Sequence, residues 1–116
     1  MAGQDLKVRT KEYALRIIRL YVALPKREEA RVIGNQVLRS GTSVGAHYRE
    51  GSRARSNAEF ISKMNVGLQE LEETEYWLEL LDEAQIVPPH LLADIRQETK
   101  ELIAIFVTII KKVKTT

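Results

Sequence analysis

Two long segments of the chain repeat apolar residues at alternating steps of three and four, and this pattern restricts the fold to packed α-helices. Such a spacing places the side chains on one stripe of a helix, where they form a seam against neighbouring helices. One seam consists of Phe60, Met64, Gly67, Leu71, Thr74, Leu78 and Leu81. The other consists of Leu92, Ile95, Thr99, Leu102, Phe106, Ile109 and Val113.

Local signals indicate where these two helices begin and end. Ser56 and Glu59 are spaced as a capping box, in which each side chain accepts a hydrogen bond from the other residue's backbone N–H. This helix should end near Gln85, and the next should begin at Pro89 or His90, because proline suits a first turn. Its last turn carries Lys111, Lys112 and Lys114, whose charges favour the negative end of the helix dipole.

Two further helices are predicted in the first half of the chain. One spans residues 8–24 and ends before Pro25, because a residue that precedes proline is pushed out of the helical region. The other spans residues 27–50, with Gly51 as the left-handed residue that ends it. The expected core face of the first is Tyr13, Ala14, Ile17, Ile18, Tyr21 and Leu24, and that of the second is Ala30, Ile33, Val37, Val44 and Tyr48.

The helix over residues 27–50 is rich in small residues. An interior glycine costs about 1 kcal/mol relative to alanine, so these glycines need a structural reason. One reason is close approach of a neighbouring helix, and the alternative is a break near Ser40-Gly41. We favour a continuous helix, because the apolar spacing keeps its phase across the glycines. The small residues are Gly34, Ser40, Gly41, Ser43, Gly45 and Ala46.

Four helices with short connections predict an all-α fold, an antiparallel up-down-up-down four-helix bundle that residues 1–116 form as a single domain. The last helix is apolar over most of its circumference, and such a helix is buried on more than one side. We therefore expect a second subunit against it, so that the chain is a homo-oligomer. The residues outside its seam are Ile103, Ile105, Val107 and Ile110.

The composition excludes several classes of function. The chain has no cysteine, so it has no disulfide, thiolate metal site or cysteine nucleophile. The longest apolar run, residues 102–107, is far shorter than the roughly 20 residues of a membrane span. The N-terminus lacks the basic and apolar regions of a signal peptide. We therefore expect a cytoplasmic protein that has no contact with a membrane.

No pattern in the sequence indicates catalysis, a metal, a cofactor or a small-molecule substrate. The Glu-x-x-His pairs of di-iron bundles are absent, and His47 with Glu50 gives only the reverse order. Phosphate-binding loops and nucleophile elbows are absent too. His47 and His90 are better explained as ordinary polar residues, and the seven acids of residues 70–83 as a solvated helix face. We expect no enzyme and no cofactor.

One arginine lies near the apolar face of the second helix. Arg39 stands between Leu38 and Ser40. We expect it to form a structural ion pair with Glu72 or Glu75 across the bundle. This pair would fix the register of the helices rather than take part in chemistry.

The small net charge of +2 hides an uneven distribution, because residues 1–58 carry a net +7 and residues 59–116 a net −5. Either the two halves face each other, within the fold or between subunits, or the basic half forms a surface that binds phosphate. The candidate nucleic-acid-binding residues are Arg49, Arg53, Arg55 and Lys63, with Arg16 and Arg19 as a second patch. Arg49 also suits a helix C-terminus without any ligand.

Four motifs lie within residues 36–81: Leu-Arg-Ser at 38–40, Ser-Val-Gly-Ala at 43–46, Glu-Gly-Ser-Arg-Ala at 50–54 and Glu-Thr-Glu-Tyr-Trp-Leu at 73–78. Together they resemble the four-helix-bundle proteins encoded in intervening sequences of bacterial 23S rRNA genes. One departure is His47-Tyr48, where that family more often has asparagine followed by an aliphatic or small residue.

The resemblance implies an antiparallel four-helix bundle that assembles into a ring-like homopentamer, with no established activity and no catalytic residues. A distantly similar bundle, the accessory variability determinant protein of diversity-generating retroelements, forms a similar pentamer and binds nucleic acid and a reverse transcriptase. By analogy at the level of the fold, we expect a non-enzymatic homo-oligomer that binds RNA or a nucleoprotein partner. The alternative is a protein–protein scaffold whose basic half neutralises the acidic helix of its neighbours.

Overall fold

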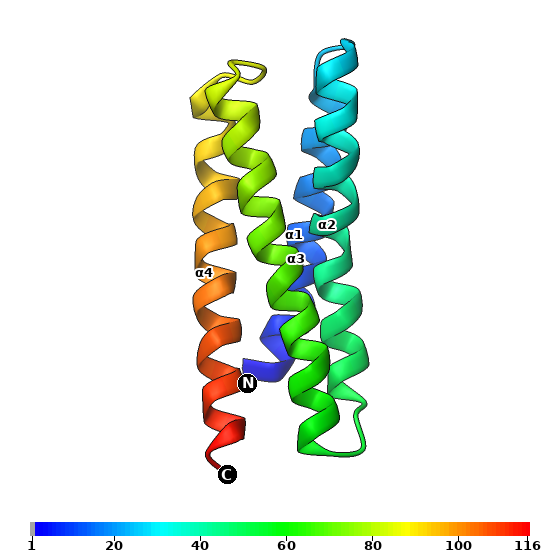
Figure 1. Cartoon of the computed structure of the whole chain (residues 1–116), viewed down its shortest axis with the longest axis vertical. Coiled ribbons are helices and arrows are strands. Elements are labelled where there is room, and N and C mark those ends of the chain that lie inside the picture. Colours follow the sequence, from blue (N-terminus) through cyan, green and yellow to red (C-terminus); the bar gives the residue numbers. More distant parts are fainter. Residues whose placement is uncertain (1) are drawn as a thin grey trace.

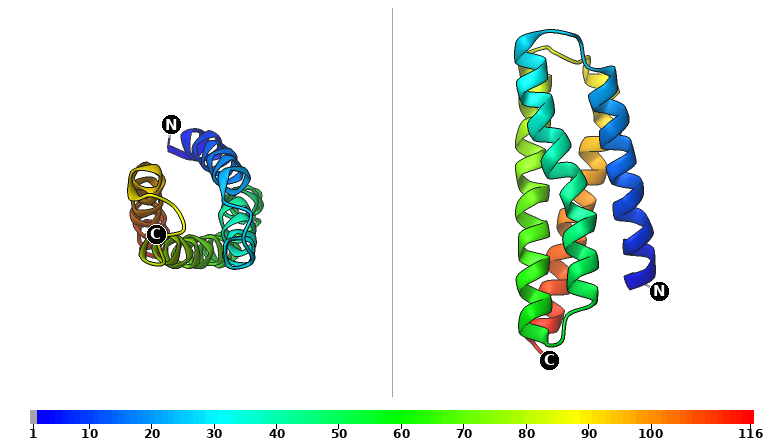
Figure 2. Two further views of the ribbon diagram at one scale, coloured as in Figure 1. Left: turned by 90° about the horizontal axis from the view of Figure 1, so that it is seen from above. Right: turned by 90° about the vertical axis from the view of Figure 1, so that its right-hand side faces the viewer.

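The computed structural model describes residues 2–116, with side chains from Leu6 onward, as an antiparallel four-helix bundle 47 Å long (Figure 1). The helices are α1 (Ala2–Ala23), α2 (Glu28–Ser52), α3 (Asn57–Glu83) and α4 (Pro89–Lys114). Each helix packs against the next, whereas α1 and α4 touch over a much shorter length. Seen end-on, the helices occupy the corners of a square, with α1 diagonal to α3 (Figure 2). The predicted all-α up-down-up-down bundle is confirmed.

Two predicted helix ends are wrong. Helix α1 is already helical at Ala2, well before residue 8. Gly51 does not end α2 in a left-handed conformation, because none of the described glycines has a positive φ and the C-cap is Arg53. Gly51 is instead a buried residue inside α2. It lies so close to α3 that a Cβ added to it would be 3.3 Å from the Cβ of Lys63. Its hydrogen side chain therefore permits the close approach of two helices.

The start of α3 follows the predicted cap with one change. The Ser56 side chain accepts a hydrogen bond from the backbone N–H of Glu59 at 3.1 Å. The Glu59 carboxylate accepts its bond at 3.1 Å from the N–H of Arg55, one residue earlier than a capping box requires. The side chain of Glu59 therefore holds the connecting turn as well as the helix.

Helix α2 is continuous through Ser40-Gly41, as predicted, because its glycines lie where α1 comes closest. A Cβ at Gly41 would lie 2.8 Å from Cγ1 of Ile17, and a Cβ at Gly45 would lie 3.1 Å from Oγ1 of Thr10. A Cβ at Gly34 would lie 2.5 Å from a methyl group of Leu24. The glycines give the side chains of α1 room to pack directly on the backbone of α2.

A buried layer of hydroxyl groups crosses the bundle, with one residue from each helix. The hydroxyls of Tyr13 and Thr99 are 2.7 Å apart, and those of Ser40 and Thr74 are also 2.7 Å apart. Each threonine donates its own proton to the carbonyl one turn earlier, at 2.7 Å for Thr99 and 2.8 Å for Thr74. Tyr13 and Ser40 are therefore the donors of the two bonds between helices.

The surplus apolar surface predicted on α4 lies elsewhere. Ile110, and not Ile109, completes the buried row of α4, and Ile103, Ile105 and Ile109 pack half-buried against the core. The large exposed apolar side chains are instead concentrated on the outer side of α1, and they include Ile18, which the sequence placed in the core. The unpartnered apolar face of the chain therefore belongs to α1.

We expect Gly41→Ala to lower the free energy of unfolding by about 1–2 kcal/mol. Alanine favours the helix by about 1 kcal/mol, but its methyl group would meet three atoms of Ile17 within 3.0 Å. Urea unfolding followed by circular dichroism measures the change. The loss should shrink when Gly41→Ala is combined with Ile17→Ala, which vacates that space. A more stable Gly41→Ala would contradict the close packing of α1 on α2.

We expect the free energy of unfolding to fall above about pH 10, the ordinary pKa of tyrosine. Burial raises the pKa of Tyr13, so above that pH the unfolded chain loses a proton that the folded chain keeps. Tyr13→Phe should make this fall shallower, by up to about 1.4 kcal/mol per pH unit. Tyr76→Phe, at an exposed site, is the control. Equal slopes in both variants would exclude the role assigned to Tyr13.

Candidate nucleic-acid interface

The four basic residues predicted around the second turn lie together at one end of the bundle. Arg49 is in the last turn of α2, Arg53 is its C-cap and Arg55 is in the turn that follows. Lys63 lies in the second turn of α3, close to the backbone of α2 at Gly51. The structure therefore gathers these residues into one surface, named here the basic end.

Acidic groups neutralise only part of this surface. Glu50 accepts from Lys63 at 3.3 Å and from His47 at 3.4 Å, and these bonds hold the pKa of its carboxyl below the ordinary value. Among the described side chains, no carboxylate lies within ion-pair distance of Arg49, Arg53 or Arg55. Three arginine side chains are therefore available to bind an anion from solution.

The last turn of α4 adds three lysines to the basic end. The C-terminus of α4 lies at the same end of the bundle as the α2–α3 turn, as both side views show (Figures 1 and 2). Sequence reasoning assigned these lysines to the helix dipole alone. Their contribution to the basic end could not be read from local sequence. It depends on the lengths and directions of the helices, which bring together two segments that are about 60 residues apart in the sequence. The residues are Lys111, Lys112 and Lys114.

The second predicted patch lies in the other half of the bundle. Arg16 and Arg19 are on α1, which runs away from the basic end, and they border a hollow of about 300 Å³ between α1 and α4. Apolar side chains and Asp94 form the rest of its lining. The structure therefore does not join these two arginines to the other four.

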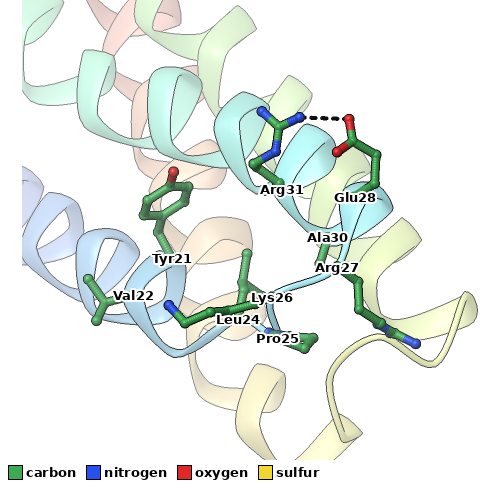
Figure 3. Close-up of a pocket in the computed structure, with 9 residues that line it drawn as sticks. All are labelled: Tyr21, Val22, Leu24, Pro25, Lys26, Arg27, Glu28, Ala30 and Arg31. Atoms are coloured by element: carbon green, nitrogen blue, oxygen red, sulfur yellow. Dashed lines mark hydrogen bonds and ion pairs between the residues drawn. The ribbon is translucent and has the colours of Figure 1, made fainter.

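A larger hollow, of about 550 Å³, lies at the α1–α2 turn (Figure 3). Its floor is apolar, and Arg31 on its rim donates a 2.6 Å hydrogen bond to Glu28. It contains no cluster of titratable groups suited to catalysis. The residues that line it are Tyr21, Val22, Leu24, Pro25, Lys26, Arg27, Glu28, Ala30 and Arg31.

The predicted ion pair of Arg39 with Glu72 or Glu75 is wrong in both partners. Arg39 pairs with Glu70, at 3.3 Å, and with Glu73, which also accepts a 3.0 Å hydrogen bond from the Trp77 indole. Glu72 faces solvent on the outer side of α3. Arg39 itself is 51% exposed, so the buried pair that would fix the register is absent at this position.

Sequence reasoning missed an ion pair that joins α1 and α4 across their short contact. The Arg9 guanidinium donates two hydrogen bonds to Glu98, at 2.7 and 2.8 Å, and one to Glu101 at 2.7 Å. These bonds raise the pKa of Arg9 and help to lower that of Glu101. The bidentate pair of Arg9 with Glu98 therefore links α1 to α4.

The histidines have no metal-binding arrangement. His47 is half-buried beside Glu50, and its other ring nitrogen lies 3.8 Å from Glu70, whereas His90 is exposed in the first turn of α4. Within residues 2–116, no group of three or more His, Asp or Glu side chains is placed to hold a metal ion. In the same part of the chain, none of the helices has the length and apolar character needed to span a bilayer.

The comparisons with known proteins decide the family. The family model of the 23S rRNA-intervening sequence protein matches residues 4–108. The chain belongs to this family. A protein of unknown function from the S23 ribosomal protein family of Bacteroides thetaiotaomicron has a similar crystal structure, with 40% sequence identity and a TM-score of 0.89. The alignment covers 96% of this chain and 99% of that one.

No curated protein matches this chain. Its family and its structural neighbour confirm the resemblance seen in the motifs of residues 36–81, and they carry no assigned activity. The likeness to retroelement proteins is not among these findings and stays an analogy.

We expect Arg39→Met to change the free energy of unfolding by less than about 1 kcal/mol, because exposed ion pairs contribute little. Arg31→Met, which breaks the exposed pair with Glu28, is the matched control and should behave alike. Thermal or urea unfolding measures both variants. A loss above about 2 kcal/mol in Arg39→Met alone would restore the register role that the sequence suggested.

Proposed function

We propose that this member of the family is a non-catalytic homo-oligomer, a pentamer, that binds structured RNA at its basic end. The observation that carries the proposal is the meeting of the α2–α3 turn and the last turn of α4 at one end of the bundle. We propose a cytoplasmic location, because an RNA ligand of this kind would be found there.

The chemistry of the basic end supports an RNA ligand. Phosphate binding by Lys and Arg gives nucleic-acid affinity without a base-reading module, and RNA helices are recognised largely by shape and backbone. Arginine forks suit phosphate oxygens, and Arg49, Arg53 and Arg55 have no carboxylate partner among the described side chains. In an oligomer, several copies of this surface would act together and raise the affinity.

The causes of the pKa shifts and the exposed apolar surface support a binding role. The pKa shifts found in the chain have structural causes, namely surface ion pairs and the burial of Tyr13 and Tyr48. The apolar outer side of α1 supports self-assembly, because contiguous exposed apolar surface marks contact sites.

We expect the protein to bind a fluorescently labelled hairpin from 23S rRNA with a Kd below about 1 µM at 0.15 M salt. The double variant Arg53→Ala/Arg55→Ala should weaken binding at least about tenfold and lower the slope of log K against log salt by about 2. Fluorescence anisotropy at several salt concentrations measures both quantities, and light scattering reports the mass of the protein.

The matched control is Arg16→Ala/Arg19→Ala, which removes the same charge from the other half of the bundle. It should leave the hairpin affinity nearly unchanged. Equal weakening by both double variants would mean that net charge, and not the basic end, attracts the RNA. An intact oligomer that binds no better than an unrelated basic protein would favour the scaffold alternative.

A further inference from the structure

The outer side of α1 carries a second heptad seam, opposite the one that faces the core. Val8, Lys11, Leu15, Ile18 and Val22 follow one another at steps of three and four. The four apolar members are between 40% and 73% exposed. A regular seam of this kind on an exposed helix face is typical of helix–helix contact. Nothing in the described chain covers it.

Helix α3 carries an outer seam with the same spacing and the opposite charge. Its members are Gln69, Glu72, Tyr76, Glu79 and Glu83, and all of them are exposed. Tyr76, at the centre, is 52% exposed and packs its ring beside that of Trp77, with centroids 5.1 Å apart. The centre of this seam therefore offers a rigid aromatic surface with carboxylates on both sides.

The hydroxyl layer places the two seams at matching heights. Tyr13 of α1 and Thr74 of α3 both belong to this layer, and the two helices run in the same direction. Two residues further along each helix are Leu15 and Tyr76. Two residues before the layer are Lys11 and Glu72. Helix rise per residue is constant, so the seams stay level along their whole length.

We propose that the outer seam of α1 docks on the outer seam of α3 in a second copy of this chain. The proposal rests on the self-assembly in the proposed function and names its contact surfaces. Leu15 packs on the Tyr76 ring of the next copy, and Lys11 pairs with its Glu72. Because α1 and α3 are diagonal in the bundle, each copy presents one seam to each neighbour (Figure 2). The contact is head-to-tail, and it forms a closed ring when each copy is rotated relative to the next about an axis parallel to the bundle, with no shift along that axis.

Charge favours this pairing over the contact of two α1 helices. An antiparallel α1–α1 contact centred on Leu15 would place Lys11 opposite the second copy's Arg19. Like charges opposed in this way destabilise a contact, whereas the carboxylates of α3 attract both cations. The aliphatic parts of the Glu79 and Glu83 side chains can cover Ile18 and Val22 while their carboxylates reach the basic rim.

The hollow at the α1–α2 turn extends the same surface. It begins at Val22, the last member of the α1 seam, and Lys26, Arg27 and Arg31 stand on its rim (Figure 3). At this height the α3 helix of a neighbouring copy ends with Glu83, where the helix dipole is also negative. The basic rim therefore faces an acidic helix end in the proposed ring.

A charge-swap cycle tests the contact. Lys11→Glu and Glu72→Lys alter exposed side chains, so circular dichroism should show both variants folded. Each should weaken assembly about tenfold, and the double variant Lys11→Glu/Glu72→Lys should recover most of that loss. Light scattering over a range of protein concentrations measures the dissociation. Lys100→Glu, at an exposed position of α4, is the matched control and should leave assembly unchanged.

Other results would overturn the proposal in distinguishable ways. If the unmodified protein assembles but neither reversal changes its mass, the seams are not the contact and self-assembly stands. If Lys11→Glu strengthens assembly, two α1 helices pair with each other. If the unmodified protein is a monomer at all concentrations tested, the homo-oligomer of the proposed function fails together with this contact.

Discussion

The hydroxyl layer of Tyr13, Ser40, Thr74 and Thr99 is the constraint on which the arrangement of the four helices depends. Each helix contributes one group, and each bond has a determined donor because the threonine protons are taken by backbone carbonyls. A shift of one helix along its axis would leave a buried hydroxyl without its partner, which costs about 1–3 kcal/mol. An apolar seam alone tolerates such shifts more easily. The layer therefore sets the relative heights of the helices, and with them the position of every surface group.

Helix α1 is held in a different way from the other three. Glycines let it pack closely on the backbone of α2, but its contact with α4 is short and polar, through Arg9 and Tyr13. Because it buries only one face in the bundle, its opposite face keeps a stripe of apolar residues in solvent. A helix with apolar residues on two opposite faces fits a molecule that is complete only in contact with another copy.

The sequence was sufficient for the helices and most of the core, because heptad spacing is a local property that survives folding. It wrongly placed Ile18 in the core and Gly51 at a helix end. A local sequence pattern does not show which face of a helix its neighbour covers. It also failed for Arg39, whose carboxylate partners on α3 depend on the relative rotation of two helices. The basic end was half predicted: Arg53 and Arg55 are close in sequence, whereas the lysines of α4 join them only through the topology.

The two explanations of the basic half of the chain are compatible once its charges are placed in three dimensions. The cations of α1 lie on the side of the bundle, along a seam whose proposed counterpart is the acidic side of α3. Those around Arg53 lie at one end of the bundle, where the described part of the chain provides few acids. Charges more than about 10 Å apart at the surface are largely screened from each other at physiological salt. The bundle is 47 Å long, so the two sets act on different partners, and a ring held by sideways contacts would leave its basic end open to RNA.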